Sequence, residues 1–461
     1  MTQITASNGK KHLLLLINLL FSSIPFTFII GTSALNLNIV LFIIVSLTFL
    51  FKDFLKLKFS LTDKIIIIFF TFVTFTGLFN TVENYYFGDR EYIYLPGIPL
   101  ADGKNHDFTI LLKTFSYLRY LILYFVLKLL VEKGWLKYNL FFISSSFFCL
   151  FVSLDIIFQY FVGVDIFGYQ SPAVRKLSGP FHEELIAGSY IQRFSLFLLF
   201  LFPIFYKIKN RIILSFVCLF LFSLILVSLI MSGNRMPFLL FLITIFLIII
   251  TEKQLKKYFW FISLFASIAF AILFYANKNI AVNYKNFFKE TVIIAKVINP
   301  VNLFKDYDFD RTHLPDHFDE FESFYDTWRM NKFIGGGVRS FRLNCPKRKN
   351  IYIGHTPEAS ERKTCNIHPH NYYLEILTEL GLVGFIVFLA IISRVLWGYI
   401  HLNNFFDNSS VQRKIVVTFF MLFFAEIFPL KSSGSFFASS NSTFIFILLA
   451  ITAALINKRK T

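Results

Sequence analysis

The chain contains twelve long apolar runs, and no other feature limits its possible folds as strongly. A helix needs about 20 apolar residues to cross a hydrocarbon core about 30 Å thick, where every backbone polar group must find its partner inside the segment. Runs of this kind fall near residues 12–31, 35–51, 64–79, 109–131, 138–163, 185–206, 211–231, 234–251, 258–275, 373–397, 413–430 and 436–456. The sequence therefore predicts an all-α integral membrane protein with about 12 transmembrane helices.

The composition agrees with this prediction. Apolar residues make up 56% of the 461 residues and charged residues only 16%, against roughly 25% charged in soluble domains. The formal net charge of +17 is typical of nucleic-acid-binding proteins. In a multi-span protein, however, lysine and arginine collect in cytoplasmic loops and at helix ends. We therefore predict contact with membrane lipids and no nucleic-acid partner.

The distribution of basic residues predicts the orientation of the spans. With residues at helix ends included and segment 276–372 left aside, the termini and loops on one side carry nineteen lysines and arginines and the short loops on the other side carry six. By the positive-inside rule, the first side is the cytoplasm. One large hydrophilic segment, residues 276–372, then lies outside the cytoplasm. We expect spans 1–9 in residues 1–275, a large periplasmic loop domain at 276–372, and spans 10–12 in residues 373–461.

Ionisable residues inside apolar runs carry a cost that usually marks a polar cavity or a buried pair, and five of them are candidates for such a role. They are Lys113, Arg119, Asp155, Arg193 and Glu426. One interpretation is a polar cavity that opens outward. The other is that Lys113 extends its amine to the membrane surface and that Arg193 pairs with Asp155 or Glu426 to hold helices together.

His370 stands at the predicted outer edge of a span. Pro369 and Asn371 are typical of a helix start, with Asn371 as the cap, so that the helix would present His370 in a fixed place. An imidazole with a pKa near 6.5 is a natural general base for a hydroxyl nucleophile. A structural role is the alternative for a histidine in this position.

Four segments together resemble the O-antigen ligase family, which also contains O-antigen polymerases and protein O-oligosaccharyltransferases. His370 and Asn371 are followed after nine residues by Gly381, and Gly384 follows two residues later, which matches the family's histidine motif. Three upstream segments are similar to further family motifs: Phe333–Phe341 with its three glycines, Ser232–Arg235, and Arg175 with Ser178–Phe181, Ala187 and Tyr190.

The resemblance implies a GT-C-like helical membrane fold in the bacterial inner membrane, with the active site facing the periplasm. The resemblance also implies the reaction, which is transfer of a glycan from a polyprenyl diphosphate to an acceptor hydroxyl, with inversion at the sugar and with neither metal nor cofactor. The acceptor is lipid A core, a carrier-linked glycan or a protein hydroxyl. His370 would be the base. Guanidinium groups would bind the diphosphate, namely Arg235, Arg175 and a loop arginine such as Arg339 or Arg342.

The chain departs from the family pattern in two places. His317 and Phe321 stand where many members have Arg-x-x-x-Trp, so the second phosphate arginine would be supplied by Arg311, Arg329, Arg339 or Arg342. His182-Glu183-Glu184 stands where members often have Asn-Pro-Asn, which is a departure in the segment that would recognise the acceptor.

Three further interpretations follow from the residues. The acidic run Asp306–Asp310 lacks the glycine and distal glutamate of a calcium loop, and we interpret it as a solvated stretch, with metal binding as an alternative. The buried charges would also suit a transporter or flippase for lipid-linked sugars, and a structural membrane protein is a third possibility. Cys345 and Cys365 share the predicted periplasmic loop, and we expect a disulfide between them.

Overall fold

The computed structural model of the chain is helical throughout the part that it describes. That part comprises residues 8–87, 106–206, 210–252, 259–298, 316–345, 369–401, 410–431 and 434–457. Within these ranges the only β contact is an isolated bridge between Ala173 and Lys176. The predicted all-α class is therefore confirmed.

The chain forms two compact units, and we describe each by itself. Unit 1 consists of Met1–Phe49, Leu130–Leu314 and Leu402–Glu426, and unit 2 of Leu50–Leu129, Pro315–His401 and Ile427–Thr461. The large hydrophilic segment 276–372 is shared between them. The expected division of the chain at residues 275 and 372 stays a prediction.

Unit 1 contains most of the helices, and two further helices continue from one unit into the other. Those of unit 1 are α1 (Asn8–Ser22), α2 (Ile24–Ile30), α7 (Tyr138–Val162), the 3-10 turn η1 (Gly179–Phe181), α8 (Ala187–Phe205), α9 (Arg211–Met231), α10 (Arg235–Thr251), α11 (Phe259–Ala276), α12 (Lys278–Ile298) and α18 (Val411–Glu426). The two shared helices are α3 (Thr32–Phe54) and α6 (Arg119–Glu132).

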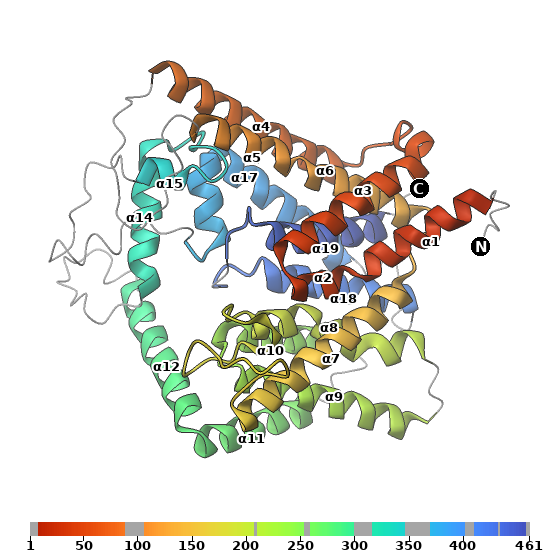
Figure 1. Ribbon diagram of the computed structural model, residues 1–461, viewed down its shortest axis with the longest axis vertical. Helices are drawn as coiled ribbons and strands as arrows, with labels where there is room; N and C mark the ends of the chain where they lie inside the picture. The colour runs from red at the N-terminus through yellow and green to blue at the C-terminus, as the bar shows by residue number, and fades with distance from the viewer. Residues whose placement is uncertain are drawn as a thin grey trace. The chain divides into compact units, whose positions relative to one another are not determined.

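Unit 2 is built around α17. Its helices are α4 (Leu61–Phe87), α5 (His106–Tyr117), α14 (Asp316–Met330), α15 (Phe341–Asn344), α17 (Tyr372–Ile400) and α19 (Ser439–Asn457). α17 packs against α4, α14 and α19. Figure 1 shows α17 as the blue helix behind α4 and α5.

Eight helices are long and apolar enough to cross a membrane, and the chain is a multi-pass membrane protein. The eight are residues 32–54, 61–82, 110–132, 138–162, 187–205, 212–231, 372–400 and 439–456, and the pair α1 and α2, bent by 47°, makes a ninth. The eight helices and the bent pair together correspond to nine of the predicted runs. The other three runs form α10, α11 and α18, which do not pass the same test among the described residues. The predicted count of twelve is not confirmed.

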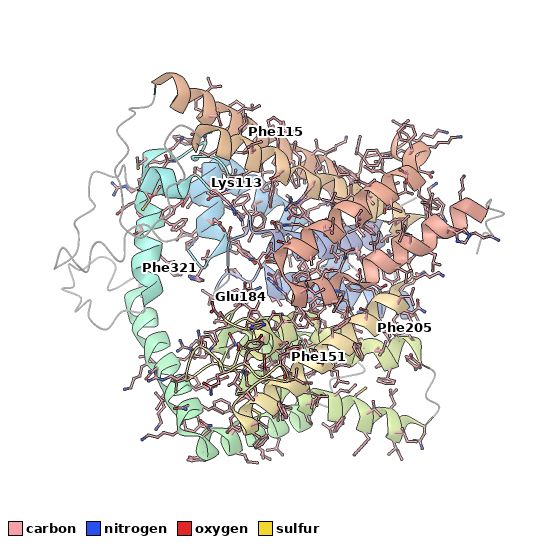
Figure 2. All side chains as sticks on the ribbon, viewed as in Figure 1. Lys113, Phe115, Phe151, Glu184, Phe205 and Phe321 are labelled. Atoms are coloured by element: carbon pink, nitrogen blue, oxygen red, sulfur yellow. The ribbon has the colours of Figure 1, made fainter. Side chains whose placement is uncertain are left out.

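Phenylalanine fills the core of unit 1. α7 and α8 lie side by side, and α18 packs on α8. The rings of Phe141 and Phe197 lie 5.1 Å apart, and that of Phe419 from α18 lies 5.2 Å from Phe197. Figure 2 marks Phe151 on α7 and Phe205 at the end of α8. Offset and edge-to-face ring contacts of this kind fix helix positions without polar groups.

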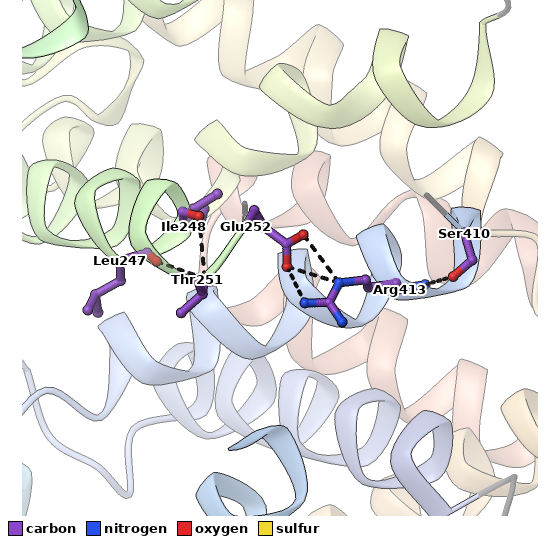
Figure 3. A network of polar contacts seen from close by, with 6 residues as sticks. All are labelled: Leu247, Ile248, Thr251, Glu252, Ser410 and Arg413. Carbon is purple, nitrogen blue, oxygen red and sulfur yellow. Dashed lines mark hydrogen bonds and ion pairs between the residues drawn. The ribbon is translucent and has the colours of Figure 1, made fainter. Parts of the chain in front are cut away.

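Two arginines inside unit 1 form ion pairs with glutamates. The Nε and Nη2 atoms of Arg193 donate to the two carboxylate oxygens of Glu426 at 3.1 and 2.6 Å, which ties α8 to α18. Arg413 makes a similar fork to Glu252, with contacts of 2.8 to 3.2 Å between α18 and the end of α10 (Figure 3). The prediction that Arg193 pairs with Asp155 or Glu426 is thus confirmed for Glu426.

Unit 2 has a buried pair that the sequence analysis missed. Lys128 of α6 donates to Asp63 in the first turn of α4, and the hydroxyl of Tyr124 donates to the same carboxylate at 2.8 Å. Both charged side chains are almost fully buried. Arg119 donates to the hydroxyl oxygens of Tyr120 and Ser439.

The fork between Arg193 and Glu426 predicts a large loss of stability when one partner is removed. Glu426→Ala leaves the guanidinium buried without its carboxylate and should lower the free energy of unfolding by roughly 3–5 kcal/mol. The double variant Arg193→Met/Glu426→Met should recover most of this loss, because an apolar pair replaces the ion pair. Unfolding of the purified protein in detergent measures both.

Asp326→Ala is the control. Asp326 pairs at 3.9 Å with the exposed side chain of Arg329, and a pair in contact with solvent contributes about 0–1 kcal/mol. A Glu426→Ala variant no less stable than this control would contradict the structural role of the buried fork.

Candidate functional site

Asn371 caps α17 as the sequence predicts. Its side-chain oxygen accepts a hydrogen bond from the amide of Leu374 at 3.1 Å, and its amide nitrogen donates to the carbonyl oxygen of Pro429 at 2.8 Å. His370 stands one residue before this cap, partly exposed, with φ at +51°. Residues other than glycine seldom adopt this left-handed conformation, so the cap and its neighbours must hold His370 in place.

The motif glycine Gly381 breaks α17 so that another segment can dock. Its φ and ψ are 64° and −172°, outside the helical region. A Cβ atom at Gly381 would lie 2.3 Å from the carbonyl oxygen of Phe333, and one at Gly335 would lie 2.5 Å from the backbone of Glu379. Only glycine permits this approach.

Backbone hydrogen bonds hold the glycine-rich turn against the break. The amides of Leu382 and Val383 donate to the carbonyl oxygens of Lys332 and Phe333 at 2.8 and 3.2 Å. In the other direction, the amide of Gly337 donates to the carbonyl oxygen of Glu379 at 2.8 Å. The two motifs that the sequence presents 30 residues apart therefore form one structural unit with the segment that carries His370.

Two buried glutamates of α17 support the same region. Glu379 accepts a hydrogen bond from the amide of Arg339 at 2.6 Å, and Arg339 has φ at +61°. Glu375 accepts from the hydroxyl of Ser435 and the amide of Phe436, both at 2.5 Å. Sequence reasoning missed both carboxylates, although four-residue spacing of two glutamates in an apolar helix is a signal that it could have used.

In unit 1, Gly233 brings two predicted motifs together. Gly233 has φ at +70°, and a Cβ atom there would lie 2.1 Å from the carbonyl oxygen of Arg175. The amide of Leu177 donates to the carbonyl oxygen of Ser232 at 3.1 Å. The segment that carries Arg175 is thereby fixed beside the turn that leads into Arg235.

Arg235 is the first residue of α10, and it lies in a cationic and aromatic environment. Its guanidinium carbon lies 5.5 Å from the centre of the Phe287 ring of α12. Burial raises the pKa of the Tyr284 hydroxyl, and the charge of Arg235 opposes that rise. Aromatic surroundings of this kind lower the local dielectric and strengthen the attraction of a cation for an anion.

Lys176 joins this cationic group, and the sequence analysis had not singled it out. Burial lowers the pKa of its amine, and the neighbouring charge of Arg235 lowers it further. Two cations that are held close together and partly removed from water form a site that favours an anion. Arg175, which precedes Lys176, is exposed.

Several predicted residues cannot be placed. His368, Cys365 and the run Asp306–Asp310 lie outside the described residues, as do the side chains of His317 and Arg342. Cys345 is buried against Phe324 and Phe341. The described residues contain no group of three or more His, Cys, Asp or Glu side chains that could hold a metal ion.

The structure thus places the predicted residues in two groups. Unit 1 holds Arg175 and Arg235, with Lys176 between them in the chain and beside Arg235 in the fold. Unit 2 holds His370 and Arg339. His370 lies just before α17, and the glycine-rich turn that carries Arg339 is docked on the same helix, where the amide of Arg339 donates to Glu379.

One comparison with known proteins finds a similarity to a protein family. Residues 219–389 match the model of the family described as O-antigen ligase. The matched range contains Arg235, Arg339 and His370, whereas Arg175 precedes it. The match confirms the resemblance to O-antigen ligases and polymerases and supports a membrane glycosyltransferase-like role in surface polysaccharide biosynthesis. No curated protein matches the chain.

The docked glycine turn predicts that Gly381→Ala is strongly destabilising. The substitution combines a backbone conformation that costs a residue with a Cβ roughly 1–3 kcal/mol with a contact of 2.3 Å to a backbone oxygen that cannot move freely. Gly31→Ala is the matched control, because Gly31 also has a positive φ, +125°, but nothing lies within 4 Å of its Cβ position. Thermal unfolding in detergent should give a clearly larger loss for Gly381→Ala. Equal losses would mean that the close approach is unimportant.

Proposed function

We propose that the protein transfers a glycan from a polyprenyl diphosphate to an acceptor hydroxyl on the periplasmic face of a bacterial inner membrane. The observation that carries the proposal is the cationic group in unit 1, where Gly233 fixes the Arg175 segment beside Arg235 and where Lys176 lies half-buried near that arginine. The family match supports the membrane glycosyltransferase-like part of this function.

The cationic group suits a diphosphate leaving group. A diphosphate ester carries about two negative charges, and bond cleavage adds a further charge to the departing oxygen. A guanidinium stays charged at every relevant pH and grips two phosphate oxygens at once, which assigns the main contact to Arg235. Lys176 adds a point charge, and Arg175 provides an exposed guanidinium at the entrance to the same loop. These protein cations would do the work that a divalent metal does in other phosphate chemistry.

His370 is the proposed base. Its neutral imidazole would accept the proton of the acceptor hydroxyl while the hydroxyl oxygen attacks the anomeric carbon. The bond between that carbon and the phosphate oxygen breaks, and the diphosphate leaves on the opposite face with both bonding electrons, so the sugar configuration inverts. Asn371 and the docked turn around Gly381 would keep the imidazole in a fixed place, and Arg339 would supply the further loop arginine.

The acceptor remains open within the family. Lipid A core, a second carrier-linked glycan and a protein hydroxyl all present the same attacking group to the base. Members share the motifs that this chain carries whatever their acceptor. The protein is therefore proposed as an enzyme of ligase or polymerase type that acts without a cofactor.

His370→Ala tests the base directly. Transfer should fall by roughly 10²–10⁴-fold, the range typical of removing a general base, while carrier-linked donor still binds. In the wild-type protein, the rate should fall on the acid side as the imidazole takes up a proton. His368→Ala is the neighbouring control and should keep most of the activity. A folded His370→Ala protein that transfers glycan at the wild-type rate would overturn the role of His370.

Substitutions in the cationic group test donor binding. Arg235→Ala should weaken donor use severely, and Arg235→Lys should recover only part, because an ammonium lacks the guanidinium fork. Lys176→Met should raise the KM for the donor more than it lowers kcat. Lys133→Met, which removes a loop lysine packed on Trp135, is the control. Equal activity in all of these variants would show that the cationic group does not bind the donor.

A disulfide between Cys345 and Cys365 forms part of the proposal. It would close a loop of about 20 residues before His370 and contribute on the order of 3 kcal/mol. Cys149 and Cys218 are free thiols, so a Cys149→Ser/Cys218→Ser variant leaves only the two loop cysteines as possible targets of a thiol reagent. Alkylation of this variant under native conditions should require prior reduction. Labelling without reduction would rule out the bond.

A further inference from the structure

Helix α7 and the loop that follows it each contain one buried aspartate, Asp155 and Asp165, and each aspartate has one oxygen that has no hydrogen-bond partner. Asp155 and Asp165 are 3% and 1% exposed. One oxygen of Asp155 accepts a hydrogen bond from the amide of Ile166 at 2.7 Å. One oxygen of Asp165 accepts from the amides of Phe167 and Tyr169 at 3.0 and 2.7 Å. The second oxygen, Oδ2, of each carboxylate is buried without a hydrogen-bond partner.

A third oxygen without a partner comes from another part of the same loop. Ser178 is fully buried, and its hydroxyl has no hydrogen-bond partner. The next residue, Gly179, lies against Asp155, because a Cβ atom there would be 3.5 Å from the unpartnered oxygen of that aspartate. The side chain of Gln159 fixes this approach by accepting from the amide of Gly179 at 2.9 Å.

The two carboxylates are neighbours in the fold, because Asp155 accepts its hydrogen bond from the amide of Ile166, the residue that follows Asp165. Among the described residues, no lysine or arginine forms an ion pair with either of them. Two neighbouring negative charges that are both removed from water and unpaired cost several kcal/mol. Either a shared proton or a bound cation has to relieve this cost.

We propose that Asp155, Asp165 and Ser178 bind one divalent cation and that Ca²⁺ fits the site best. All three groups offer oxygen, the ligand atom of hard cations. Ca²⁺ accepts carboxylate, hydroxyl, carbonyl and water oxygens in irregular geometry, whereas Mg²⁺ keeps several waters that a buried site would have to admit. Each aspartate divides its two oxygens between the loop backbone and the ion.

The cation would have a structural role. The loop from Asp165 to Ser178 carries Arg175 and Lys176, and it reaches the turn at Ser232 and Gly233 through Leu177. An ion at its base would fix the loop before it docks. The ion would not contact the donor, and the inference holds whether or not the protein transfers glycans.

Direct binding of Ca²⁺ tests the proposal without any variant. The purified full-length protein in detergent, treated with EDTA and dialysed, should bind radioactive ⁴⁵Ca²⁺ saturably at one ion per chain at pH 7.5. Added CaCl₂ should raise the thermal unfolding midpoint by roughly 2–6 °C, and MgCl₂ should raise it less. Absence of saturable binding would overturn the proposal.

Variants locate the ion. Asp165→Asn and Asp155→Asn should each abolish the bound ion and the CaCl₂ response, because each removes a charged ligand. Asp326→Asn, which changes a partly exposed aspartate in unit 2, should leave both unchanged. Undiminished binding in Asp165→Asn and Asp155→Asn would place the ion elsewhere. A carboxyl pair that shares a proton predicts instead that either variant is more stable than wild type and that CaCl₂ has no effect, and that outcome would also overturn the proposal.

Discussion

A hydrocarbon environment offers no hydrogen-bond partner, and the described structure depends on how the chain meets that constraint. Each break in a helix or charge within a span has to be satisfied by another part of the chain. Arg193 forms an ion pair with Glu426, and Lys128 forms one with Asp63. At the break in α17, the amides after Gly381 donate to the carbonyl oxygens of Lys332 and Phe333. The glycine-rich turn therefore completes the hydrogen bonds of a broken helix and is not a passive connection.

This requirement also explains why family motifs that are separated in sequence occur together. Gly335 and Gly381 approach each other only because neither has a Cβ atom. Gly233 plays the same part in unit 1, where it admits the backbone of Arg175. In each unit, glycines allow two segments to meet, and the charged or titratable residues of the proposed site flank those meeting points.

The sequence alone predicted the features that depend on a single segment, namely the apolar length of the spans and the local pattern of a helix cap. Nine of the twelve predicted runs form long apolar helices or a bent pair, because the length of a hydrocarbon-spanning segment is a local property. The cap at Asn371 was also predicted, since it depends only on the side-chain oxygen of Asn371 and on the backbone amide of Leu374 three residues away. α10 and α18 were predicted as spans but contain 17 and 16 residues, short of the length the rule requires.

Contacts between distant segments were not readable in the same way. Lys128 and Asp63 stand 65 residues apart, near the ends of their helices, where each alone resembles an ordinary surface charge. Lys176 was counted as a loop lysine because nothing local shows that Gly233 brings its segment to Arg235. The buried pair of Glu375 and Glu379 was hidden by the stronger motif around it. Such choices of partner depend on tertiary packing, which one sequence without its fold does not reveal.

The central claim is that the protein makes a glycosidic bond. The most direct measurement uses purified protein in proteoliposomes with polyprenyl-diphosphate-linked glycan, labelled in the sugar, and an acceptor supplied on one side. The account predicts that label appears in the acceptor and that free polyprenyl diphosphate is released in equal amount. Labelled glycan that crosses the bilayer while still attached to its carrier, with no diphosphate released, would contradict the account and identify a transporter.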